Sequence, residues 1–185
     1  MLGILRGFLP WILYSIFYGT NPDRFMLAIG VALISSVLVD WKELKAGFIL
    51  TRCTFAYFAL LLILAALFHW PWLQTNTWLI SNCVLAAIAL GSALIKKPFT
   101  MQYAKLEVAE QYWNGPLFKQ INYTLTIMWG IIFLLTALVN YFYVQDPKLN
   151  GLSYMLLSNV GWFIGAYLNH WFPKYWKARY LKVKT

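Results

Sequence analysis

Long apolar runs alternate with short polar breaks along this chain of 185 residues. An α-helix rises 1.5 Å per residue, so about 20 apolar residues are needed to cross a bilayer. Runs of about this length predict an all-α fold, a polytopic transmembrane helical bundle. Its six apolar segments are residues 2–18, 25–39, 46–69, 77–95, 121–144 and 152–172.

The first two segments are shorter than the others, which leaves counts of five and six full spans open. Segment 25–39 reaches membrane thickness only by including polar residues at both ends. Segment 2–18 contains Arg6 and Pro10, so it is expected to be tilted or re-entrant. The breaks hold turn or charge signals such as Asn21-Pro22 and Asp146-Pro147, which a bilayer core does not tolerate.

The connection between segments four and five is the longest. Its middle, residues 98–111, begins with proline and places Phe99, Tyr103 and Leu106 at helical spacing. We predict an interfacial helix here, because charged and apolar faces can coexist at a membrane surface. A solvated linker is the alternative.

Composition agrees with a membrane domain. Hydrophobic residues make up 61% of the chain and charged residues only 11%, against roughly a quarter in soluble domains. The formal charge of +9 arises mainly in loops that would share one side, which the positive-inside rule assigns to the cytoplasm. The C-terminus is then cytoplasmic under either count. We predict one transmembrane domain, residues 1–172, followed by a basic juxtamembrane tail, residues 173–185.

Polar residues within the segments are the candidate ligand contacts. Arg52 lies inside the third segment, where it either snorkels to the headgroups or binds a phosphate or anionic lipid. The side-chain amides of Asn82, Asn140 and Asn159 need hydrogen-bond partners from the protein, because the surrounding lipid offers none. They join helices together or line a polar pathway.

Small residues and the basic tail suggest packing and anchoring. Ala87 with Gly91, and Gly161 with Gly165, are spaced for close approach of helix backbones. The tail interleaves bases with aromatics, and directly after a span this pattern favours attraction to anionic headgroups over nucleic-acid binding. Its basic residues are Lys174, Lys177, Arg179, Lys182 and Lys184.

Catalytic and metal sites are not predicted. The carboxylates, including Asp40 and Glu43, fall in loops or at segment ends, and no ionisable cluster shares one depth. His69 falls at the outer end of segment three and His170 at the inner end of segment six, roughly 30 Å apart across the hydrocarbon, so they cannot share one haem iron. The expectation is therefore a protein without catalytic residues, metal or cofactor.

The order of several motifs resembles the intracellular septation protein A family of bacterial inner-membrane proteins. The resemblance rests on the opening Phe8-Leu9-Pro10, the motif Lys96-Lys97-Pro98, and Trp129 followed eleven residues later by Asn140. The chain differs in a longer, more aromatic connection after Pro98 and in Thr126, where the family tends to have asparagine. The resemblance implies a non-enzymatic protein associated with cell division, cell shape and envelope synthesis.

Two functions follow from the sequence. The first is a scaffold or accessory protein of the bacterial inner membrane that packs against envelope or division proteins and an anionic bilayer. The alternative is a carrier or channel for a small molecule or lipid. A filled bundle interior would favour the scaffold, whereas a polar cavity would favour the carrier.

Overall fold

The computed structural model describes the backbone of residues 2–19, 21–68, 71–146 and 151–183, and side chains within these ranges except at 2, 151–155 and 179–183. All regular structure in these ranges is helical, which confirms the predicted all-α class. The chain divides into two compact units, Leu2–Thr77 and Trp78–Thr185. Each is described separately below.

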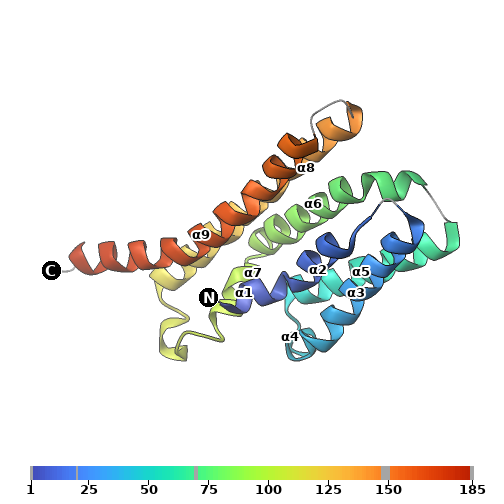
Figure 1. Cartoon of the computed structure of the whole chain (residues 1–185). Helices are drawn as coiled ribbons and strands as arrows, with labels where there is room; N and C mark the ends of the chain where they lie inside the picture. The colour runs from blue at the N-terminus through green and yellow to red at the C-terminus, as the bar shows by residue number, and fades with distance from the viewer. Residues whose placement is uncertain (1, 20, 69–70, 147–150, 184–185) are drawn as a thin grey trace. The chain divides into compact units, whose positions relative to one another are not determined.

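The first unit contains α1 (Leu2–Gly7), α2 (Leu9–Phe17), α3 (Pro22–Leu38), α4 (Trp41–Ala46), α5 (Ile49–Phe68) and the first turns of α6 (Pro71–Leu94). Within this unit α2 packs against α3, and α3 packs against α5 (Figure 1). The predicted first segment is therefore two helices that meet at Phe8. Pro10 lies in the first turn of α2, where its missing N–H breaks no helical hydrogen bond.

Residues at the start of α3 explain why the chain turns there. The Asn21 side chain accepts a hydrogen bond of 2.8 Å from the backbone N–H of Asp23, and Pro22 occupies the first helical position. The helix has 17 residues, about 26 Å, and is thus shorter than a hydrocarbon core of about 30 Å.

Aromatic side chains fill the interior of the first unit. The Trp11 ring lies 4.9 Å from the Phe58 ring between centroids and stacks on Tyr57 at 5.1 Å. The Trp11 indole N–H donates a buried hydrogen bond of 2.9 Å to the Thr54 hydroxyl. These contacts join α2 to α5, and the fully buried Ala28 and Ala32 form part of the core of the same unit.

The second unit contains the rest of α6, α7 (Phe99–Ala104), the short 3₁₀ helix η1 (Glu110–Tyr112), α8 (Pro116–Gln145) and α9 (Gly151–Val183). Helices α8 and α9 run side by side in opposite directions (Figure 1). Trp129 of α8 is fully buried and lies 5.5 Å from Phe133 and 5.9 Å from Trp162 of α9, between ring centroids. This aromatic cluster is the core of the second unit.

The helix predicted over residues 98–111 is observed only over Phe99–Ala104. Its buried face holds Phe99, Thr100 and Tyr103, and the Thr100 hydroxyl lies 2.7 Å from the Asn122 carbonyl and 2.8 Å from the Thr126 hydroxyl of α8. The chain then forms turns in which Lys105 lies over the Trp113 ring. The observed helix is therefore shorter than the one that spacing alone predicted.

Three described helices are long and apolar enough to cross a membrane, namely α5, α6 and α8. They correspond to the predicted third, fourth and fifth segments. Many of their large apolar side chains are exposed, including Ile63, Leu94 and Leu135. Such surfaces are unfavourable in water and suit lipid, so the chain has the properties of a membrane protein.

Candidate functional site

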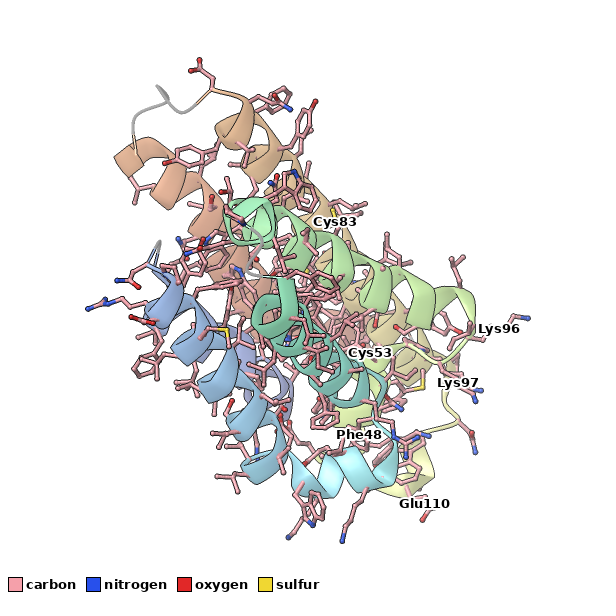
Figure 2. The ribbon with its side chains drawn as sticks, turned by 90° about the vertical axis from the view of Figure 1, so that its right-hand side faces the viewer. Phe48, Cys53, Cys83, Lys96, Lys97 and Glu110 are labelled. Carbon is pink, nitrogen blue, oxygen red and sulfur yellow. The ribbon has the colours of Figure 1, made fainter. Side chains whose placement is uncertain are left out.

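The chain reverses direction between α3 and α5 through a corner that we call the α4 corner, residues 39–52. Helix α4 ends at Ala46 and is followed by Gly47, which has a φ of 82° and so adopts the left-handed conformation that glycine tolerates best. The N–H of Gly47 donates to the Leu44 carbonyl at 3.2 Å, and that of Phe48 donates to the Glu43 carbonyl at 3.0 Å. These two bonds form a Schellman motif that stops the helix. Figure 2 shows Phe48 where α4 passes into α5.

Two carboxylates lie at this corner between the second and third apolar segments, as the sequence predicted, and both are buried. Asp40 is 1% exposed and Glu43 is 8% exposed. Neither oxygen of Asp40, nor Oε2 of Glu43, receives a hydrogen bond from any described residue. Buried charges normally have hydrogen bonds or a charged partner, so this arrangement is energetically costly.

Arg6 of α1 forms an ion pair with Asp40. Its Nε lies 3.8 Å from Oδ1 of Asp40, and its Nη2 donates to the backbone carbonyl of Val39. Burial, together with the negative charge of Glu43, raises the pKa of Asp40 from its ordinary value of 3.8 to about 6, although Arg6 acts in the opposite direction. Asp40 therefore changes charge in a mildly acidic range.

Basic side chains of the corner point outward instead. Lys42, Lys45 and Arg52 are exposed, as is Arg6 with a side chain 51% exposed. The Lys45 ammonium lies 4.5 Å from the centroid of the Trp41 ring, and Trp41 is itself 49% exposed. Helix α4 therefore buries its acidic side chain and presents its bases to the surroundings.

Arg52 lies in the first turn of α5, closer to the helix end than the sequence indicated. Its Nε donates to the Leu44 carbonyl at 3.2 Å, and its Nη2 lies 3.5 Å from the Lys45 carbonyl. A Cβ at Gly47 would lie 3.2 Å from the guanidinium carbon, so glycine leaves room for this contact. The guanidinium thus binds carbonyl groups at the C-terminus of α4, a position that favours a cation.

The three predicted asparagines lie in different environments. Asn82 and Asn140 are buried, and their amides donate to carbonyls one turn earlier in their own helices, Trp78 at 2.9 Å and Thr136 at 2.7 Å. Oδ1 of Asn82 is buried and receives no hydrogen bond from a described residue. Asn159 of α9 is exposed. The structure therefore does not place the three amides along one polar surface within a described unit.

The predicted small-residue pairs also differ from each other. A Cβ at Gly165 would lie 2.6 Å from the Trp129 ring, and one at Gly161 would lie 2.9 Å from Ile132. Both glycines of α9 therefore lie directly against α8. By contrast, Ala87 is exposed and a Cβ at Gly91 would meet no atom within 4 Å.

The predicted tail continues α9, which runs to Val183 through Pro173. Lys174 and Lys177 are exposed, and the Lys174 ammonium lies 2.7 Å from Nε2 of His170. The side chains of Arg179 and Lys182, and the whole of Lys184, lie outside the described residues. The α9 helix has 33 residues, about 50 Å, which exceeds the hydrocarbon thickness.

Sequence reasoning missed the burial of Asp40 and Glu43. The pattern Asp40-Trp41-Lys42-Glu43 with Gly47 is typical of a short helix with acids at its start and glycine after its end, and both acids then share one side. Spacing within residues 40–47 does not show which side of the helix faces inward, because burial depends on contacts with the rest of the unit.

Within the described ranges, no group of three or more His, Cys, Asp or Glu residues is arranged to hold a metal ion. Cys53 and Cys83 are both exposed free thiols (Figure 2). No protein-family model matches the chain, and neither the curated proteins nor the solved structures include one with significant similarity.

Proposed function

We propose that this chain is a non-enzymatic, multi-pass protein of the bacterial inner membrane with a scaffold or accessory role in envelope synthesis or septation. In this proposal the six apolar segments cross or enter the bilayer, residues 98–120 lie on the cytoplasmic side, and the C-terminus is cytoplasmic. Five spans remain the alternative, with the first segment re-entrant.

The observation that supports a scaffold over a carrier is how the interiors of the two units are filled. Trp11 and Phe58 occupy the first unit, and Trp129 and Phe133 occupy the second. Most buried polar side chains bond within their own helix. Examples are the hydroxyls of Ser36, Thr77, Ser92 and Thr136 and the amides of Asn122 and Asn140. Groups bonded in this way are poorly arranged to coordinate a moving solute.

A scaffold also needs surface for partners. Helix α8 exposes a long set of apolar side chains that are not needed for its own unit: Ile127, Ile131, Leu134, Leu135, Leu138 and Phe142. Helix α9 exposes Val160, Phe163, Ile164 and Tyr167 in the same way. In a membrane these surfaces contact lipid or the spans of another protein, and van der Waals packing there can support helix association.

Site-specific photocrosslinking in bacterial membranes tests the proposal. A photoreactive residue at Leu135, which is 59% exposed, should crosslink to a defined membrane protein, whereas one at Phe133, which is 1% exposed, should not. The captured protein should be the same when the probe is moved to Phe163, if one partner covers both helices. Crosslinks to lipid alone from every exposed position would contradict a scaffold.

One observation favours the carrier as a second candidate. Oδ1 of Asn82 is buried without a hydrogen-bond donor among the described residues, so a ligand could supply one. A ligand bound there would raise the melting temperature of the wild type but not of Asn82→Leu. Equal responses of the two proteins to a panel of candidate solutes would remove this support.

A further inference from the structure

We infer that the α4 corner is a binding site for the phosphate of an anionic phospholipid headgroup. Arg6, Lys42, Lys45 and Arg52 form its basic surface, and Trp41 is its aromatic element. The inference depends on α5 lying in a bilayer and not on the proposed scaffold role.

The first argument is the separation of charge at the corner. Lys42, Lys45 and Arg52 of the corner and the adjoining Arg6 are exposed, whereas Asp40 and Glu43 are buried, so these six groups carry a net charge of 4 − 2 = +2 with both acids ionised. A helix that merely faced solvent would be expected to expose its acid as well. Because Glu43 is buried while Lys42 and Lys45 are exposed, the accessible groups of α4 are selective for anions.

The second argument is depth. Helix α5 is a candidate span that begins at Ile49, three residues after α4 ends at Ala46. The corner must therefore lie at the end of a span, where headgroup phosphates are found. Trp41 is half exposed at this same end, as expected for an indole at the membrane interface. This position favours a lipid phosphate over a soluble anion.

The third argument is preorganisation. The Leu44 and Lys45 carbonyls hold the Arg52 guanidinium through Nε and Nη2, while its Nη1 group makes no hydrogen bond with a described residue. The Trp41 ring similarly holds the Lys45 ammonium. Fixed side chains lose less entropy on binding, so these two cations are better phosphate ligands than freely moving ones.

Native mass spectrometry of the full-length protein with added phosphatidylglycerol or phosphatidylcholine tests the site. The wild type should retain phosphatidylglycerol preferentially. The variant Lys42→Gln/Lys45→Gln/Arg52→Gln should lose at least about tenfold of this preference, since each cation near a membrane contributes about fivefold. The control Lys96→Gln/Lys97→Gln/Lys119→Gln removes the same charge from exposed positions of the other unit, and should reduce the preference by a smaller factor than the corner variant does, because general attraction to the membrane is lost in both but the fixed cations of the corner are lost in only one (Figure 2).

If Arg52 is needed for folding, the double variant Lys42→Gln/Lys45→Gln is compared with Lys96→Gln/Lys97→Gln, and the same difference is expected. Equal retention by corner and control variants would overturn the inference. Inorganic phosphate is the second probe: displacement of the lipid by millimolar phosphate would overturn the assignment to a lipid and indicate a soluble phosphate. Persistence of phosphatidylglycerol in phosphate buffer supports the assignment. If no protein is crosslinked from Leu135, the proposed scaffold role is refuted, but the inference of a lipid site at the α4 corner is unaffected.

Discussion

Replacing Asp40 with asparagine tests the buried carboxylates of the α4 corner. The folded protein binds the Asp40 proton up to about pH 6, whereas an unfolded chain releases it near 3.8. The folded state therefore holds more protons between these values, and the free energy of unfolding falls as pH rises from about 4 to about 6. Asp40→Asn removes this dependence because the amide does not ionise.

The magnitude follows from the pKa difference. A difference of about 2 corresponds to about 3 kcal/mol, and solvent near the half-exposed Arg6 reduces this value. We therefore expect the stability of Asp40→Asn relative to the wild type to increase by about 1–3 kcal/mol between pH 4 and pH 7.5.

The assay is denaturant unfolding of purified protein in mixed micelles, followed by tryptophan fluorescence across this pH range. Asp23→Asn is the matched control, because Asp23 is an exposed acid at the start of α3. Its stability should remain parallel to that of the wild type. Parallel curves for Asp40→Asn and the wild type would refute the reasoning that burial and the charge of Glu43 raise the pKa of Asp40 in the folded protein.

Four further predictions, one of them with a matched control variant, test other contacts. Gly165→Ala should destabilise the protein by about 1–3 kcal/mol in thermal unfolding, because its Cβ would lie 2.6 Å from the buried Trp129 ring. The control Gly91→Ala, whose Cβ would lie in open space, should be neutral or slightly stabilising, and equal effects of the two substitutions would contradict the packing of Gly165 on Trp129. Gly47→Ala should cost about 1 kcal/mol or more because its φ of 82° is unfavourable for alanine, and faster amide exchange confined to α4 would locate the effect there. Arg6→Gln should raise the pKa of Asp40 above about 6, since Arg6 now opposes protonation, and a titration of stability against pH would then shift upward; an unchanged midpoint would argue against the ion pair. Removal of the residues after Pro173 should weaken binding to anionic vesicles, and unchanged flotation with phosphatidylglycerol vesicles would count against the tail anchor.

Helix class and the positions of most breaks could be predicted from the sequence because they depend on local chemistry. Asn21-Pro22, for example, is a predicted break, and Pro22 begins α3 as proline at a first turn suggests. The extent of helices was predicted less well where tertiary contacts decide it. Helix α7, for example, covers only Phe99–Ala104 of the predicted range 98–111.

Candidate site residues were harder to predict because burial depends on distant parts of the chain. Asp40 forms its ion pair with Arg6, 34 residues earlier, and Gly165 makes its close contact with Trp129 on another helix. Gly91 has the same small-residue spacing as Gly165, yet only Gly165 lies against an aromatic ring. Spacing identifies which residues share a helix face, but the neighbouring helix determines what that face contacts.

Native mass spectrometry of the protein extracted gently from its own membrane tests the central proposal most directly, because it detects lipids, small ligands and protein subunits in one measurement. The scaffold proposal predicts a complex with a defined membrane protein, together with bound anionic lipid, and no stoichiometric small solute. A protein free of partners that carries a small ligand, lost in Asn82→Leu, would contradict the scaffold and support a carrier.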